Sequence, residues 1–171
     1  MKHEYFRTFA RYNQWANRRL YAACAELPEA EYMKPRPCYF GSLHATLNHV
    51  LVGDRLWIGR ITGHMPDIKR LDEILYGELL GLRVAREAED AQIINVIDGM
   101  DAPTLNTTLR YTTMTGETAT TPMRYVLAHM FNHQTHHRGQ AHDLLSHAGA
   151  SPPPLDLAHY LRESAMSSAP G

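Results

Sequence analysis

Six histidines are clustered toward the carboxyl end of the chain, and their spacing could hold a metal ion. They are His129, His133, His136, His137, His142 and His147. Because an α-helix turns by about 100° per residue, the first four would share one helical face with Gln140, whereas His142 would lie on the opposite side. Two histidines four positions apart can bind one metal ion, since their side chains lie one turn apart. The spacing therefore indicates a metal site.

Two histidine pairs compete for this role, His129 with His133 and His133 with His137. A catalytic site of the zinc type takes three protein ligands and leaves a further position for water, so a third ligand must come from another helix. His44 and His49 lie in an earlier helical stretch. They differ by about 140° around a helix, so both cannot face one site. His49 lies in an apolar run, where metal coordination would explain a histidine.

Four long stretches have apolar residues at helical spacing and must position these histidines. They are residues 3–26, 42–62, 72–99 and 121–147. We expect Ser42 and Asp72 to cap the second and third helices and Gly63 to end the second. Thr121 and Pro122 are expected to open the fourth helix as its N-cap and first helical residue. Residues 28–41, which are rich in proline, are predicted to form a loop.

Two shorter segments complete the predicted fold. Residues 104–120 are rich in threonine around Gly116 and Glu117, which predicts a small hairpin or extended excursion, and residues 155–165 predict a short helix. The fold class is therefore all-α, a four-helix bundle with an excursion before the last long helix. We expect one domain over residues 1–165 and a flexible tail over residues 166–171.

Composition excludes several classes of protein. The chain has 171 residues, which suits one domain with a buried core. Lysine and arginine total 17 against 18 aspartate and glutamate residues, a formal charge of −1, so the sequence lacks the excess positive charge of a DNA-binding protein. No run approaches the roughly 18 apolar residues of a membrane span, and the first residues do not resemble a secretory signal. We expect a cytoplasmic protein with no nucleic-acid or membrane partner and with Cys24 and Cys38 reduced.

Three segments resemble motifs of the DinB/YfiT-like metalloenzyme family, which is distinct from the translesion polymerase of similar name. Residues 132–140 read NHQTHHRGQ and are similar to the family's signature on the last helix, and residues 12–17 read YNQWAN and are similar to its motif on the first. Residues 42–51, together with Asp54 and Trp57, are similar to the family's second helix. The motifs agree in order and spacing over nearly the whole chain.

The resemblance implies an up-down-down-up four-helix bundle, often a homodimer, with one divalent metal ion held by His49, His133 and His137. Zinc or nickel is expected, with iron, manganese and copper as alternatives, because imidazole suits many of these metals. Activities in the family mainly depend on low-molecular-weight thiols, as in transfers onto bacillithiol and a mycothiol-dependent isomerisation. The resemblance thus implies a small-molecule substrate and a low-molecular-weight thiol as partner.

Three neutral imidazoles leave a divalent metal ion with its full charge, so a water or thiol bound to it would be acidified. We therefore expect a metal-dependent enzyme that acts on a small molecule in the manner of a thiol S-transferase. The alternatives are a metal-dependent hydrolase, a non-catalytic metal-binding or sensor bundle, and a structural bundle whose histidines only form hydrogen bonds. A site closed by a fourth protein ligand would favour the sensor. His136 and Glu117 are the candidate general bases.

Other residues near the motifs have expected supporting roles. A ligand histidine needs an acceptor for its second nitrogen, and Gln140 and Asn13 are candidates, although Asn13 could equally join two helices. Arg138 is expected to pair with Asp54. Gly139 costs a helix about 1 kcal/mol relative to alanine, so we expect a neighbouring helix to approach it closely.

Overall fold

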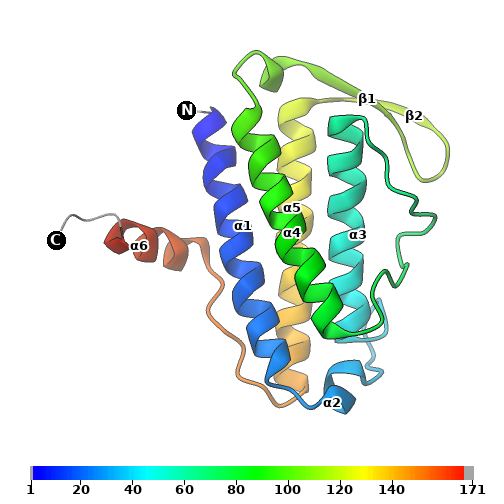
Figure 1. Cartoon of the computed structure of the whole chain (residues 1–171), viewed down its shortest axis with the longest axis vertical. Coiled ribbons are helices and arrows are strands. Elements are labelled where there is room, and N and C mark those ends of the chain that lie inside the picture. Colours follow the sequence, from blue (N-terminus) through cyan, green and yellow to red (C-terminus); the bar gives the residue numbers. More distant parts are fainter. Residues whose placement is uncertain (1, 168–171) are drawn as a thin grey trace.

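Four long helices form a bundle in the computed structural model, which describes residues 2–167 (Figure 1). They are α1 (Lys2–Ala25), α3 (Leu43–Thr62), α4 (Leu79–Gly99) and α5 (Met123–His147). Helices α1 and α5 run in one direction and α3 and α4 in the other, and α1 and α3 each pack against both α4 and α5. This arrangement confirms the predicted bundle and its up-down-down-up order. No described helix is both long and apolar enough to span a membrane.

Both predicted ends of α3 are confirmed. The Ser42 side chain accepts a hydrogen bond from a backbone amide of the first turn at 3.0 Å, and Gly63 adopts a left-handed φ of 80° just after the last turn. The predicted start of the next helix at Asp72 is wrong, because α4 begins at Leu79. The Asp72 carboxylate instead binds the guanidinium of Arg70 in the long α3–α4 connection.

Short elements join the long helices. The predicted loop at residues 28–41 contains the short helix α2 (Glu29–Met33). A single 3₁₀ turn, η1 (Thr104–Asn106), precedes strands β1 (Thr108–Thr112) and β2 (Thr118–Pro122), which pair antiparallel. The hairpin crosses one end of the bundle (Figure 1) and confirms the predicted excursion. Because β2 extends through Pro122, α5 begins at Met123 with Pro122 as its N-cap, one residue later than the predicted N-cap Thr121 and first helical residue Pro122.

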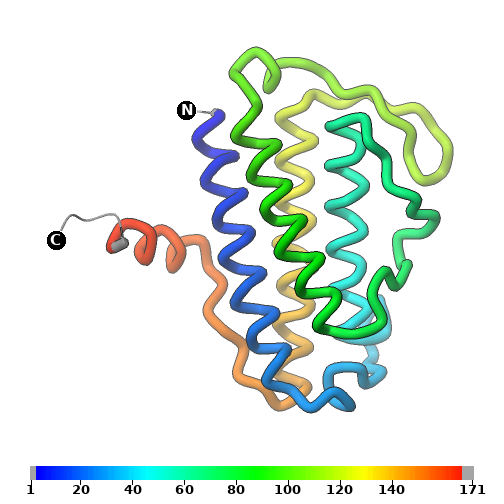
Figure 2. The backbone as a smooth tube through the Cα atoms, in the orientation of Figure 1, coloured from blue at the N-terminus to red at the C-terminus, as the bar shows by residue number. Residues whose placement is uncertain are grey.

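The segment after α5 returns along α1. Residues 148–156 run back beside α1 before α6 (Leu157–Ser167) extends away from the bundle (Figure 2). The Tyr12 hydroxyl donates to the Leu155 carbonyl at 2.8 Å, and the Trp15 indole donates to Glu163 at 2.9 Å. The predicted short helix is therefore confirmed. Of the tail predicted at residues 166–171, residues 168–171 lie outside the described part of the chain.

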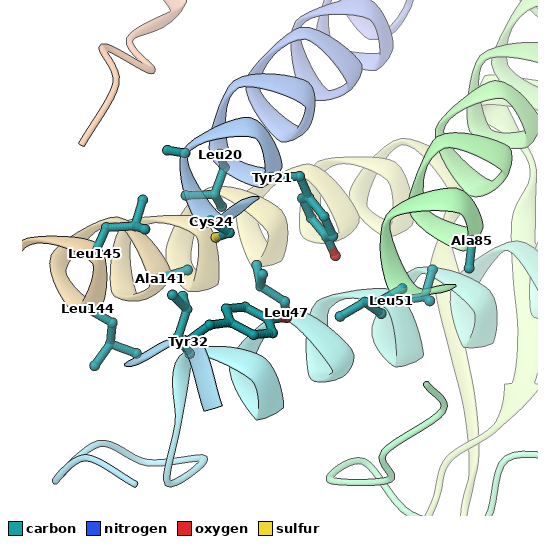
Figure 3. Close-up of a cluster of buried hydrophobic side chains, with 13 residues drawn as sticks. Leu20, Tyr21, Cys24, Tyr32, Leu47, Leu51, Ala85, Ala141, Leu144 and Leu145 are labelled. Carbon is teal, nitrogen blue, oxygen red and sulfur yellow. The ribbon is translucent and has the colours of Figure 1, made fainter. Parts of the chain in front are cut away.

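The two largest apolar clusters among the described residues fill the bundle, one toward each end. Figure 3 shows the first, where Leu20, Leu47, Leu51 and Leu145 meet from α1, α3 and α5. The second lies toward the hairpin and includes Phe6, Ile58, Ile93, Ile97, Leu127, Met130 and Phe131. Full burial of a side chain of this size stabilises the fold by about 1.5–3 kcal/mol. The clusters hold α3 and α5 together on either side of the histidines.

A buried polar network lies between the two apolar clusters. Arg86 binds Asp54 at 2.6 Å and Asp90 at 3.0 Å, and Asn13 donates to Asp90 at 3.2 Å. The predicted ion pair between Arg138 and Asp54 is wrong, because Arg138 donates to the Asn13 side-chain oxygen at 2.6 Å. Both ends of the Asn13 amide are thus bound within the network, so Asn13 joins helices. The two guanidiniums and two carboxylates bring opposite charges into one network, which offsets part of the cost of burying them.

Candidate metal centre

Three imidazole rings converge between α3 and α5. Helix α3 contributes His49, and α5 contributes His133 and His137, which lie one turn apart. The Nε2 atom of His49 is 3.1 Å from that of His133 and 3.2 Å from that of His137. The structure therefore brings together the three histidines that the resemblance assigns to metal binding, and this group could hold a metal ion.

Hydrogen bonds on the outer side of two rings determine which nitrogens face the centre. His49 Nδ1 lies 2.7 Å from the Leu71 carbonyl oxygen, and His137 Nδ1 lies 2.7 Å from Gln140 Oε1. Both oxygens can only accept, so each Nδ1 carries the proton and each neutral ring presents an Nε2 lone pair. Two lone pairs cannot form a hydrogen bond with each other. The close approach of His49 to His137 is therefore favourable only with a cation between them.

A divalent metal ion fits this donor set. Zinc binds imidazole nitrogen at about 2.0–2.1 Å, so two such ligands at angles of about 90–110° lie roughly 2.8–3.4 Å apart. The Nε2 separations of 3.1 Å and 3.2 Å fall within this range. Imidazole also suits nickel, copper and iron, so the donor set indicates a divalent metal without selecting one.

Burial keeps the three rings uncharged. It lowers the pKa of His49, His133 and His137, and the neighbouring imidazoles lower that of His133 further, to about 3. Metals bind the neutral form of histidine. At neutral pH, no proton has to leave these rings before a metal ion binds.

Gly53 makes room for the His133 ring. A Cβ atom on Gly53 would lie 2.7 Å from His133 Cε1 and 3.2 Å from its Nδ1, whereas carbon atoms attract each other best at about 3.5–4.0 Å. The close approach predicted at Gly139 is wrong, because a Cβ atom there would meet nothing within 4 Å. Sequence reasoning missed Gly53, although a glycine in the middle of the helix that carries His49 was an available signal.

Asn48 fixes the α3–α4 connection beside His49. Its side-chain oxygen accepts hydrogen bonds from the Leu75 and Tyr76 amides at 2.9 Å and 3.1 Å, and its nitrogen donates to the Tyr76 carbonyl at 3.2 Å. These bonds hold the connection against α3, where the Leu71 carbonyl orients His49. Sequence reasoning also missed Asn48. The available signal was an asparagine inside an apolar helical run, since a buried side-chain amide requires hydrogen-bond partners.

A cleft of about 940 Å³ leads to the three rings. It is lined by Tyr39, Phe40, Ala45, His49, Leu71, Asp72, Ile74, His133, His136, His137 and Gln140. Its walls therefore come from α3, from the connections on both sides of α3 and from α5. Among residues 2–167, no fourth histidine, cysteine or carboxylate joins the cluster. The centre is thus accessible from the cleft, whose volume suits a small molecule.

The rival histidines lie outside the cluster. The His129 ring packs against Trp57 with ring centres 5.1 Å apart, and its centre is 6.0 Å from that of His133. His44 is buried and bonds to a tyrosine hydroxyl at 2.9 Å. His136 lines the cleft, where its Nε2 lies 3.4 Å from the nitrogen of the Gln140 amide. His136 is therefore placed to meet a ligand in the cleft without joining the three converging rings.

The fold and the site together define a class of protein, a helical bundle with a candidate metal centre between two facing helices. The sequence matches the DinB family over residues 1–167, and the chain belongs to that family. It is 28% identical to Protein DinB of Bacillus subtilis (strain 168) over 158 residues, covering 88% of this chain and 90% of that protein. The crystal structure of a DinB-like protein from Bacillus cereus ATCC 10987 has a TM-score of 0.66 at 15% identity, covering 85% of this chain and 94% of that one. This likeness supports the fold.

Proposed function

We propose that this protein is a metal-dependent enzyme that joins a low-molecular-weight thiol to a small electrophilic molecule. The observation that carries the proposal is the convergence of three neutral imidazoles at a cleft without a fourth protein ligand among the described residues. Catalytic metal ions keep a position for substrate, whereas structural ones are closed by protein ligands. Zinc or nickel is the proposed metal.

A divalent ion held by His49, His133 and His137 would retain its charge and lower the pKa of a thiol that reaches it. The Leu71 carbonyl and Gln140 keep two of these histidines in the tautomer that presents Nε2.

Two further side chains shape the path of a ligand and its proton. Phe40 stacks on His49 with ring centres 4.0 Å apart, which excludes water from that face of the ring. Of the two candidate bases, Glu117 does not line the cleft, whereas His136 does. We therefore assign proton transfer to His136.

The proposed reaction balances without a further reactant. The thiol sulfur forms a bond to an electrophilic carbon as the bond from that carbon to its leaving group breaks. The leaving group departs with the electron pair, and the thiol proton passes to His136 and then to solvent.

Metal content is the first test, measured by elemental analysis on protein purified without a histidine tag. We expect about one metal ion per chain in the wild type and none in the His133→Ala/His137→Ala variant. The control variant His129→Ala/His147→Ala removes two exposed histidines from the same helix and should keep the metal. A wild type that binds no metal after incubation with zinc and nickel would overturn the proposal.

The reaction itself is tested with 2-mercaptoethanol and 1-chloro-2,4-dinitrobenzene, followed by absorbance of the thioether product. We expect metal-loaded wild-type protein to accelerate the reaction more than metal-stripped protein does, and more than the His133→Ala/His137→Ala variant does. Bound metal without acceleration for a panel of small thiols would instead support a non-catalytic metal-binding bundle.

A further inference from the structure

Large apolar side chains surround the mouth of the cleft. Tyr39, Leu71 and Ile74 line it and are 88%, 47% and 48% exposed. Tyr39 belongs to the α2–α3 connection, and the other two belong to the α3–α4 connection, so two separate segments bring apolar groups to one place. Exposed apolar groups gathered at one site mark a surface that binds a ligand or partner. We call these three residues the apolar rim.

Aromatic contacts connect the apolar rim to the histidines. The Tyr39 and Phe40 rings meet edge to face with centres 4.8 Å apart, and Phe40 stacks on His49 at 4.0 Å. Phe40 also meets His137 edge to face, with ring centres 5.5 Å apart. A molecule that reaches the histidines from the cleft mouth therefore lies against a continuous apolar and aromatic surface.

Apart from its histidines, the cleft offers no cationic side chain to a charged ligand tail. No lysine or arginine is among the described residues that line it. Its single carboxylate, Asp72, is bound to Arg70 at 2.8 Å and 2.6 Å. Burying an ionised group against the apolar rim would cost free energy, with no lysine or arginine among these lining residues to offset it. The walls therefore match an uncharged tail.

We propose that the apolar rim is the subsite for an uncharged, aromatic or aliphatic tail of the small molecule whose other end reaches the three histidines. The proposal rests on the proposed function, because the histidines hold the reacting end of the ligand. The apolar rim would give the protein a preference for ligands with an apolar tail. A metal ion cannot supply this preference, since it interacts with the donor atom of the ligand and not with the tail. Leu71 contributes twice, with its carbonyl orienting His49 and its side chain forming the rim.

The test compares two uncharged thiols on the full-length protein loaded with cobalt(II). Phenylmethanethiol and 2-mercaptoethanol each present one sulfur, but only the first has an apolar ring. Changes in the cobalt absorption spectrum during titration give the affinity for each. We expect the wild type to bind phenylmethanethiol at least about tenfold more tightly, because a few apolar carbons in a fitting pocket contribute about that much.

Three variants assign the preference to the apolar rim. Leu71→Ser/Ile74→Ser keeps the Leu71 backbone carbonyl and should remove most of the difference between the two thiols. Tyr39→Ser should reduce the difference, and since the side chain is 88% exposed, the fold does not depend on it. Leu80→Ser is the matched control, because Leu80 is 70% exposed on α4 and does not line the cleft. It should retain the full difference.

The outcomes separate this proposal from the one on which it rests. Equal affinities for the two thiols in the wild type would overturn the subsite, as would a difference that persists in both rim variants. Failure of the wild type to take up cobalt would overturn the metal centre and the subsite together.

Discussion

Replacing Gly53 with alanine tests whether the close approach of α3 to the His133 ring shapes the metal centre. The new Cβ atom would lie 2.7 Å from His133 Cε1, about 1 Å closer than the distance at which carbon atoms attract. In the metal-free protein the ring can move by this amount, because Cε1 lies at the far end of its side chain. A bound metal restricts this movement, because ligand distances stay within about 0.2 Å of their ordinary values.

Gly53→Ala should therefore weaken metal binding more than it lowers the free energy of unfolding. Loss of a group that merely orients a ligand weakens metal binding by about 10–100-fold, or roughly 1.4–2.8 kcal/mol, and displacing a ligand should cost at least this much. For the metal-free protein, overpacking costs roughly 1–3 kcal/mol, and the better helix propensity of alanine offsets about 1 kcal/mol. The net change in the free energy of unfolding should be at most about 2 kcal/mol.

Zinc affinity is measured by competition with a chromophoric chelator, and the unfolding free energy by urea denaturation of metal-free protein. Gly139→Ala is the matched control, because it also replaces a helical glycine beside the histidines, but its Cβ atom meets nothing within 4 Å. We expect this control to keep wild-type zinc affinity and to gain up to about 1 kcal/mol of stability. Wild-type zinc affinity in Gly53→Ala would refute the reasoning.

Three further predictions concern the surroundings of the centre. Gln140→Leu removes the acceptor for His137 Nδ1, so zinc affinity should fall about 10–100-fold. Gln140→Glu keeps an acceptor and should retain the affinity. An unchanged zinc Kd for the leucine variant, measured by chelator competition, would contradict this prediction. Burial lowers the pKa of His44, so between that pKa and the unfolded value of about 6.5 the folded chain binds fewer protons there than the unfolded chain. The unfolding free energy of metal-free protein should therefore fall as the pH drops below about 6.5, and in urea denaturation at several pH values His44→Gln should remove part of this fall. Arg86→Met leaves the buried Asp54 carboxylate without its cation and should lower the unfolding free energy by about 3–5 kcal/mol, so a loss under about 1 kcal/mol would show that the pair matters little.

The long helices could be predicted because their signals are local. Apolar residues at helical spacing located all four, and Ser42 and Gly63 marked the ends of α3 through their own side-chain and backbone properties. The starts of α4 and α5 were mispredicted because distant residues decide them. Asn48 binds the backbone amides of Leu75 and Tyr76, and the chain there is not helical, although the local pattern favoured a helix.

The histidines of the site could be predicted only in part from spacing. One turn of helix separates His133 from both His129 and His137, so the spacing alone cannot choose between the two. The family resemblance pointed to His137. The structure shows the physical reason, because His129 lies beside Trp57 while His137 faces His49 across the α3–α5 contact.

Residue order alone was enough to predict four helices and several histidines on one face of the last of them, since helical periodicity depends only on residue order. Which histidines meet, what orients them and what lines the cleft depend on contacts between distant parts of the chain. The Leu71 carbonyl reaches His49 across 22 positions of the chain, and the room for His133 depends on Gly53 of another helix. Such contacts depend on how the helices and their connections pack against one another, which no local pattern of residues encodes.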